Sequence, residues 1–128
     1  MTLTVGMDVV EVERIRSAAD GAGDLLADMF TPAEIVACTS QRHPHARLAA
    51  CFAVKEAFLK AAGMGLNFGL LFKDIEVVNQ VSGAPELRLS GRARELTGST
   101  DLVKCLVSSA FTDTLACAVV ALQRKRIE

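Results

Sequence analysis

Hydrophobic positions are densest over residues 47–65, in the run RLAACFAVKEAFLKAAGMG. Ala, Leu, Lys and Glu dominate this run and all favour helix, and no glycine or proline interrupts it before Gly63. Apolar residues recur at helical spacing in one stripe, which predicts a largely buried helix. The stripe consists of Leu48, Cys51, Phe52, Leu59 and Ala62, widened by Val54, Phe58 and Ala61. Gly63 and Gly65 predict a left-handed turn at the end of this helix.

A second line of the same helix combines small residues with charge, in the order Ala49, Ala53, Glu56, Lys60 and Gly63. A carboxylate and an ammonium one turn apart, flanked by small side chains, leave room for a ligand beside two charges. The same spacing is that of an ordinary ion pair on a helix surface, which contributes roughly 0.2–0.5 kcal/mol. The helix alone favours the ion pair, and a second acid elsewhere in the chain shifts the balance towards a ligand site.

That second acid is Asp8, in an alternating run near the start of the chain. The alternation predicts a β-strand over residues 3–12. Its apolar positions are Leu3, Val5, Met7 and Val9, with Thr4, Gly6 and Asp8 between them. Aspartate is a poor strand former, and a buried one must be paired or bind a cation. The competing interpretation places Asp8 at a strand end, as the N-cap of a helix.

The rest of the chain consists of short helical segments and two hairpins. Thr31, Pro32 and Glu34 form a strong helix start, in which Glu34 completes a capping box with Thr31. Helices are predicted over residues 11–19, 31–38 and 90–96, a short apolar turn or helix over 25–30, and a polar loop over 40–45. Strands at 74–78 and 86–89, and at 102–109 and 115–122, pair as hairpins. This order predicts a single α+β domain over residues 1–128, with an antiparallel sheet packed against the long central helix.

Composition narrows the class of protein. Hydrophobic residues make up 51% and charged residues 23% of 128 residues, which is typical of a globular domain with a substantial core. The net charge of −1 gives no electrostatic case for nucleic acid. The four cysteines stand in apolar runs without metal-site spacing, which indicates reduced thiols in the cytoplasm. No apolar run approaches the ~20 residues needed to span a bilayer, so we expect a soluble protein with no membrane partner.

A series of short motifs follows the order found in one known family. These motifs are Gly6-Met7-Asp8, Phe30-Thr31 with Glu34, FAVKEAF at 52–58, Lys60-Ala61, Gly63-Met64-Gly65, DIEV at 74–77 and Gly83-Ala84-Pro85. On these motifs the chain resembles holo-[acyl-carrier-protein] synthase, the small type of 4′-phosphopantetheinyl transferase, over residues 4–122. The FAxKEAF…KAxGxG block is highly specific, whereas GxD alone is a weak signal.

The resemblance implies transfer of the 4′-phosphopantetheine arm of coenzyme A to a serine of an apo acyl carrier protein, with Mg²⁺ and with release of adenosine 3′,5′-bisphosphate. Asp8 and Glu56 match the metal-binding acids of the family, and Lys60 matches the lysine that faces the pyrophosphate. Carboxylates suit Mg²⁺, which prefers hard oxygen ligands, and a lysine suits the charge that develops on phosphate oxygens.

The resemblance also implies binding surfaces around these residues. Gly63 and Gly65 match the loop against which coenzyme A packs, and Pro85 matches a proline near its nucleotide. Arg14 and Arg16 lie on the predicted helix that matches the one with which the family docks the acidic carrier protein. Family members are typically homotrimers with sites between neighbouring subunits. Fatty-acid, polyketide and peptide synthesis all remain open as the source of the carrier.

Three positions depart from the family pattern: Cys51 replaces the usual Arg, Phe111 a usual His, and Met64 a usual Thr. Loss of the Arg removes a charge-assisted contact of the kind that contributes about 1.5–3 kcal/mol. Because the acids and the lysine remain, we expect transfer with weaker coenzyme A binding, in a pocket that Cys51 and Phe111 make less charged. The competing hypothesis is a non-catalytic relative that binds carrier protein or coenzyme A. We expect His43 and His45, in the polar loop, to be solvated.

Overall fold

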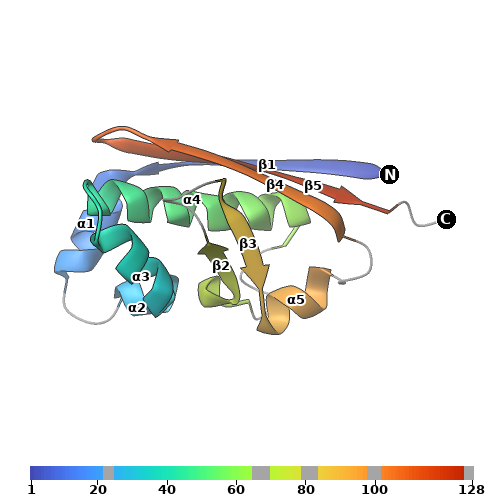
Figure 1. The fold of residues 1–128 in the computed structure, drawn as a ribbon, viewed down its shortest axis with the longest axis horizontal. Helices are drawn as coiled ribbons and strands as arrows, with labels where there is room; N and C mark the ends of the chain where they lie inside the picture. Colours follow the sequence, from blue (N-terminus) through green and yellow to red (C-terminus); the bar gives the residue numbers. More distant parts are fainter. Residues whose placement is uncertain (22–24, 65–69, 79–83, 98–101, 126–128) are drawn as a thin grey trace.

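A three-stranded antiparallel sheet forms one layer of the molecule (Figure 1). The computed structural model describes residues 1–21, 25–64, 70–78, 84–97 and 102–125. The sheet has the order β1-β5-β4, where β1 is Thr2–Glu11, β4 is Leu102–Phe111 and β5 is Leu115–Arg124. β4 and β5 form the predicted terminal hairpin, with Phe111 paired to Ala116. The Thr112 hydroxyl accepts hydrogen bonds from the backbone N–H groups of Thr114 and Leu115, which closes the turn.

The long helix α4 (Pro44–Ala62) lies along the inner face of this sheet (Figure 1). Alternate residues of β5 face the helix and are buried: Ala116, Ala118, Val120 and Leu122. Thirteen of the nineteen residues of α4 are buried, so the helix is covered nearly all round and not along one stripe only. The predicted α+β architecture, an antiparallel sheet packed on a long central helix, is confirmed.

Smaller elements cover the side of α4 opposite the sheet (Figure 1). Near one end lie the helices α1 (Val12–Asp20), α2 (Leu25–Met29) and α3 (Pro32–Thr39). Beside them are the 3₁₀ turn η2 (Phe72–Asp74), the hairpin of β2 (Ile75–Val78) and β3 (Glu86–Leu89), and the helix α5 (Gly91–Thr97). The helix α4 is therefore the core element that every layer shares. Within the described residues, no helix has the length and apolar character needed to cross a bilayer.

The predicted helix start at α3 is confirmed in detail, and one predicted boundary is wrong. Thr31 and Glu34 form the reciprocal capping box, with Pro32 in the first turn. The polar loop expected over residues 40–45 is shorter than predicted, because α4 begins at Pro44 and not at Arg47. His43 has a left-handed backbone (φ 59°) that turns the chain into this helix, and Pro44 supplies a φ suited to its first position.

Candidate active site

Asp8 and Lys60 meet between strand β1 and the end of helix α4. Lys60 Nζ lies 3.0 Å from Asp8 Oδ1 and also donates a hydrogen bond to the carbonyl oxygen of Met7 at 3.0 Å. The Asp8 side chain is only 16% exposed, whereas that of Lys60 is 54% exposed. Asp8 lies within β1, and Glu11 holds the N-cap position of α1, so the interpretation of Asp8 as a helix cap is wrong. Lys60 therefore links the helix to the strand.

Glu56 adds a second carboxylate to this pair from one turn earlier in α4. Partial burial raises the pKa of Glu56 above its usual value, and the Asp8 carboxylate raises it further. The Lys60 ammonium and, more weakly, the Arg14 guanidinium act in the opposite direction. Lys60 follows Glu56 by one turn of α4 and pairs with Asp8 at 3.0 Å. The structure thus brings Asp8, Glu56 and Lys60 into one group, which we name the acid–lysine cluster.

Close packing of β1 on α4 holds the acid–lysine cluster together. A Cβ atom at Gly6 would lie 2.0 Å from the carbonyl oxygen of Ala57 and 2.6 Å from the backbone nitrogen of Ala61. Only glycine allows this approach of strand to helix. Ala49 and Ala53, expected to leave room for a ligand, are fully buried in the core. That expectation is wrong for these two residues, because their small size serves packing inside the core.

The remaining coenzyme A residues predicted from the resemblance are not all placed at this cluster. Gly63 ends α4 with φ 71°, is exposed, and has no atom within 4 Å of the position that a Cβ would take. Gly65 lies outside the described residues. Pro85 directly precedes β3, which pairs with β2 and not with the strand that carries Asp8. The open surface beside Lys60 is therefore that of Gly63.

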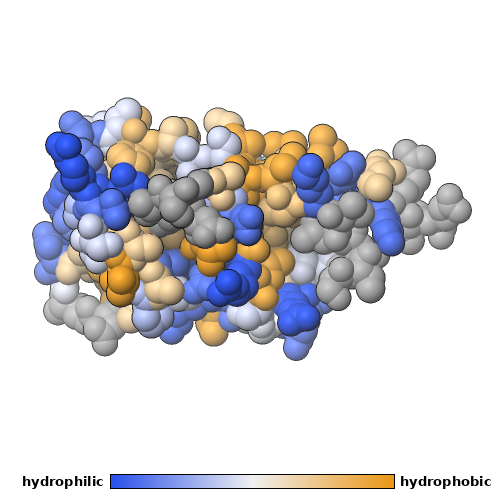
Figure 2. All heavy atoms as spheres, in the orientation of Figure 1, coloured by the Kyte–Doolittle hydropathy of each residue, from blue (hydrophilic) through white to orange (hydrophobic). Residues whose placement is uncertain are grey.

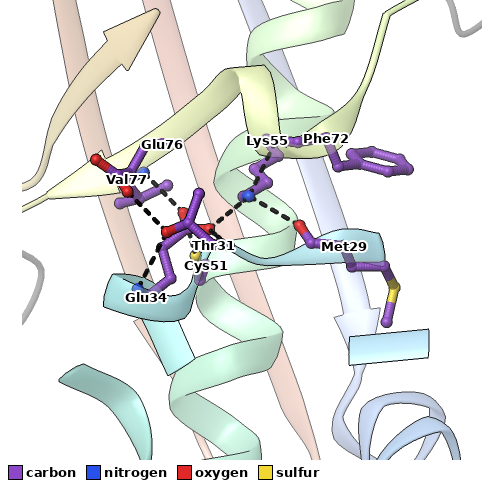
Figure 3. A network of polar contacts seen from close by, with 8 residues as sticks. All are labelled: Met29, Thr31, Glu34, Cys51, Lys55, Phe72, Glu76 and Val77. Carbon is purple, nitrogen blue, oxygen red and sulfur yellow. Dashed lines mark hydrogen bonds and ion pairs between the residues drawn. The ribbon is translucent and has the colours of Figure 1, made fainter. Parts of the chain in front are cut away.

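A buried polar network on the opposite side of α4 was not foreseen (Figure 3). Lys55 and Glu34 are both fully buried, and Lys55 Nζ lies 2.7 Å from Glu34 Oε1. Lys55 also donates hydrogen bonds to the carbonyl oxygens of Met29 and Phe72, at 2.8 and 3.0 Å. The other Glu34 oxygen accepts from the backbone N–H of Val77 at 2.8 Å. One ion pair thereby ties α2, α3, β2 and η2 to the helix that carries Glu56.

The sequence did contain a signal for this network. Lys55 stands in the apolar run FAVKEAF, where a buried ammonium needs an acidic partner. The sequence pattern predicts only the capping box for Glu34. In the structure its carboxylate accepts hydrogen bonds both from the Thr31 backbone N–H and from Lys55 Nζ. Because Glu34 and Lys55 lie far apart in the sequence, local patterns do not predict that they pair.

Cys51 belongs to this network and not to a ligand pocket. Its side chain is fully buried, and its Sγ donates a hydrogen bond to Glu34 Oε2 at 3.2 Å. Burial, with the neighbouring Glu34 carboxylate, raises the pKa of the Cys51 thiol well above its usual value. The expectation that Cys51 makes a coenzyme A pocket less charged is therefore wrong. A neutral Cys51 thiol does not compete with Glu34 for the positive charge of Lys55.

Phe111, the other departure, lies at the end of β4 against two residues from the start of α4. The Arg47 guanidinium carbon is 5.3 Å from the centre of the Phe111 ring, and the His43 ring centre is 6.4 Å away. Phe111 borders an open cavity of about 330 Å³ with Arg47, Ala50, Ser109 and Ala110. The Arg47 guanidinium thus lines the cavity beside Phe111.

The predicted docking arginines lie on the surface of α1. Both Arg14 and Arg16 are exposed, and Arg16 Nη1 lies 2.6 Å from Glu13 Oε2 within the same helix. Arg14 is the one whose charge reaches Glu56. The two arginines thus differ in their relation to the acid–lysine cluster, which sequence spacing alone did not reveal.

The acid–lysine cluster fits a magnesium ion better than a metal with a full protein ligand set. Within the described part of the chain, no group of three or more His, Cys, Asp or Glu side chains could hold a metal. Mg²⁺ is commonly bound by one or two carboxylates together with water and substrate phosphates. Burial and then the Asp8 carboxylate raise the pKa of Glu56, and a divalent cation offsets the repulsion between two carboxylates.

Comparison with known proteins places these residues in a family. The model of the 4′-phosphopantetheinyl transferase superfamily matches residues 4–120. A holo-[acyl-carrier-protein] synthase of Geobacter sp. (strain M21) is 42% identical over 125 residues, which cover 97% of this chain and 100% of that protein.

Solved structures agree in fold. A Chronobacterium ammoniagenes ACPS–CoA complex superposes with a TM-score of 0.86 at 24% identity and covers 98% of this chain and 100% of its own. The holo-[acyl-carrier-protein] synthase of Helicobacter pylori, in complex with coenzyme A, has a TM-score of 0.78 at 28% identity over 93% of this chain and 99% of its own. The chain therefore belongs to the 4′-phosphopantetheinyl transferase superfamily of enzymes.

Proposed function

We propose that this protein transfers the 4′-phosphopantetheine arm of coenzyme A to a serine of an apo acyl carrier protein. The observation that carries the proposal is the meeting of Asp8, Glu56 and Lys60 at the contact of β1 with α4. The name of the Geobacter relative and the coenzyme A bound to the Helicobacter protein support the choice of both substrates. Adenosine 3′,5′-bisphosphate is the second product that follows from this reaction.

Each member of the cluster has a role that its chemistry supports. Asp8 and Glu56 are the carboxylates that would hold Mg²⁺, and the bound ion would neutralise charge developing on the phosphate oxygens of coenzyme A. The half-exposed Lys60 binds the pyrophosphate by charge-assisted hydrogen bonds, and Asp8 orients its ammonium. Gly63 leaves the backbone open to the substrate, and Gly65 follows it in the sequence.

An apolar outer sheet face supports a homotrimer with sites between subunits. Large side chains on this face are 40–65% exposed: Leu3, Val5, Met7, Val9, Leu106, Leu115 and Val119. In the view of Figure 2, hydrophobic residues gather along part of the edge where the sheet lies. A contiguous apolar face of this kind marks an interaction site in a water-exposed protein. A second copy of the chain is the occupant that we propose.

The carrier and the compartment complete the proposal. Arg14 and Arg16 project from α1 and provide positive charge for an acidic carrier helix. Four free cysteines, two of them buried in the core, suit a reducing cytoplasm.

Intact-mass spectrometry tests this function. Apo acyl carrier protein is incubated with the protein, coenzyme A and Mg²⁺, and its mass is followed with time. We expect the carrier to gain the mass of one phosphopantetheine arm, and a carrier with its acceptor serine changed to alanine to gain nothing. An unmodified carrier that nevertheless co-purifies with the protein would favour the non-catalytic relative.

A further inference from the structure

Lys60 is the cation that pairs with the Asp8 carboxylate. Its Nζ lies 3.0 Å from Asp8 Oδ1 and donates a second hydrogen bond to the carbonyl oxygen of Met7, also at 3.0 Å. The Asp8 side chain is largely buried, and a buried carboxylate needs a partner. Among the described residues, no other group forms a hydrogen bond or an ion pair with this carboxylate. The ammonium of Lys60 therefore lies on a carboxylate that we assign to Mg²⁺.

A divalent cation at Asp8 would compete with this ammonium for the same negative charge. The charges that act on Glu56 are the Asp8 carboxylate, the Lys60 ammonium and the Arg14 guanidinium, so the two acids already face two cations. A metal ion added to this balanced group would leave an excess of positive charge at short range in a partly buried site, which is unfavourable. The pyrophosphate of coenzyme A carries a negative charge on each phosphate and would remove that excess. Metal and pyrophosphate together restore a balance that the metal alone upsets.

Of the two partners, Lys60 is the one that can move. Asp8 is fixed by β1, because the nearby Gly6 rests directly on the backbone of Ala57 in α4. The Lys60 side chain is 54% exposed, and a lysine ammonium on its flexible four-carbon stem can turn to a new partner. An ion pair with one partner half exposed is weak, so the ammonium leaves the carboxylate at little cost.

A second lysine of α4 shows the contrast. Lys55 is fully buried, and its ammonium donates hydrogen bonds to the Glu34 carboxylate and to the carbonyl oxygens of Met29 and Phe72. Three donors bound to acceptors on three separate elements leave this lysine no alternative position. In the part of the chain that the structure describes, the Lys60 ammonium has two acceptors, both on β1, so one of its N–H groups remains for another partner.

We propose that Lys60 is a stand-in cation, which pairs with Asp8 until coenzyme A draws its ammonium onto the pyrophosphate and so leaves the carboxylate to Mg²⁺. This inference rests on the proposed function and deepens it, since it concerns how the same site takes up its two charged components. Metal and coenzyme A then bind cooperatively, and each raises the affinity for the other by the same factor. Without coenzyme A the protein binds Mg²⁺ weakly, because the ion must first displace Lys60.

Titration with Mn²⁺ in the absence of coenzyme A, followed by electron paramagnetic resonance, tests the competition at Asp8. Mn²⁺ takes the same oxygen ligands as Mg²⁺. At about 0.15 M salt, interactions beyond roughly 8 Å are largely screened, so the affinity reports mainly on direct partners. Lys60→Met should tighten Mn²⁺ binding by about 5- to 10-fold, as expected for a carboxylate freed from a partly exposed ion pair, and Lys60→Gln should do the same.

Two controls separate displacement of Lys60 from a general loss of positive charge. Arg14→Met removes the other cation that acts on Glu56 and should tighten Mn²⁺ binding by no more than about 2-fold. Lys104→Met, at an exposed lysine of β4, should leave the affinity unchanged. Equal affinity in wild type and both Lys60 variants would overturn the proposal, and so would a gain no larger than that of Arg14→Met.

Calorimetric titration with coenzyme A, once with EDTA and once with saturating Mg²⁺, measures the cooperativity. In wild type, Mg²⁺ should tighten coenzyme A binding by about 10-fold or more. This factor should fall by at least about 3-fold in Lys60→Met, where no ammonium has to leave Asp8. If Lys60 only holds the pyrophosphate, its loss weakens coenzyme A binding equally with and without metal, and an unchanged factor therefore overturns the stand-in role.

These titrations need neither a carrier protein nor transfer, so this inference and the proposed function can fail separately. Tighter Mn²⁺ binding and a reduced factor in Lys60→Met support the stand-in role even if the carrier stays unmodified. Wild-type values in both titrations contradict it even if the carrier gains its phosphopantetheine arm.

Discussion

The backbone of Gly6 touches the backbone of Ala57, so closely that a Cβ atom at position 6 would stand 2.0 Å from the Ala57 carbonyl oxygen. This contact sets the distance between β1 and α4, and therefore between Asp8 and the helix that carries Glu56 and Lys60. Any displacement of β1 relative to α4 would therefore change the positions of Asp8, Glu56 and Lys60 relative to one another.

Gly6→Ala should consequently impair both stability and transfer. Forcing a methyl group into this contact should lower the free energy of unfolding by about 1–3 kcal/mol, measured by urea denaturation. Transfer by the folded fraction should fall more than coenzyme A binding, since the acids move relative to one another. Gly21→Ala, where a Cβ would meet its nearest atom at 3.2 Å, is the control. Wild-type stability in Gly6→Ala would show that the two elements separate easily.

The ion pair between Lys55 and Glu34 should be essential to the fold and indirect in its effect on catalysis. Lys55→Met leaves a buried carboxylate without its cation, which should cost about 3–5 kcal/mol of unfolding free energy. The double variant Lys55→Met/Glu34→Gln should recover part of that loss, so a double-mutant cycle should give a clear coupling energy. Lys104→Met changes an exposed lysine and serves as control. Additive losses would mean that the two residues act independently.

Stability of the ligand-free protein should depend on Glu56 in a pH-specific way. The folded state raises the pKa of Glu56, so protonation of Glu56 contributes to folding stability. This contribution is complete below the ordinary glutamate pKa and is lost as the pH rises through the raised pKa. Above that range the ionised Glu56 opposes folding. Glu56→Gln should therefore raise the Tm at pH 7–8 without metal, and the gain should shrink towards pH 4.

Thermal melts of wild type and Glu56→Gln across this pH range, with EDTA, provide the measurement. Glu86→Gln, at an exposed carboxylate of β3, should change the Tm little at any pH. A Tm gain for Glu56→Gln that grows as the pH falls would contradict the direction of the shift.

Charge reversal on α1 should weaken carrier binding, with different side effects at the two arginines. Arg16→Glu should raise the KM for the carrier on the order of 10-fold at low salt, and the difference from wild type should shrink as salt is added. Arg14→Glu should in addition change the Mg²⁺ dependence, because its charge reaches Glu56. Steady-state kinetics at two salt concentrations measure both effects, with Arg94→Glu as control. A carrier KM unchanged in both variants would move the docking surface elsewhere.

Local signals in the sequence predicted the elements well, and the site only in part. The capping box at Thr31, the helix stop at Gly63 and the alternation around Asp8 are short-range patterns, and each appears as predicted. The pairing of Lys55 with Glu34 and the burial of Cys51 depend on residues far apart in the chain. Small residues are ambiguous in a sequence, since an alanine such as Ala53 fits both the lining of a pocket and a tight contact in the core.

The sequence also did not predict which face of β1 packs against the core. Leu3, Val5, Met7 and Val9 form the apolar set of β1, yet this set points away from the core, and Gly6, Asp8 and Val10 face the helix. Alternation shows which residues share a face of a strand. It does not show which face packs on the core when the outer face is apolar as well. The position of α4 determines which face of β1 is buried.

The Mg²⁺ dependence of transfer by variants of the acid–lysine cluster tests the central claim most directly. Transfer to an apo carrier protein is followed by intact mass over a range of Mg²⁺ concentrations for wild type, Asp8→Asn, Glu56→Gln and the control Glu86→Gln. If Asp8 and Glu56 share the ion, both cluster variants should need at least about 10-fold more Mg²⁺ for half-maximal rate, or should lose transfer altogether, and the control should match wild type. A wild-type Mg²⁺ dependence and turnover in either Asp8→Asn or Glu56→Gln would contradict the assignment of the active site.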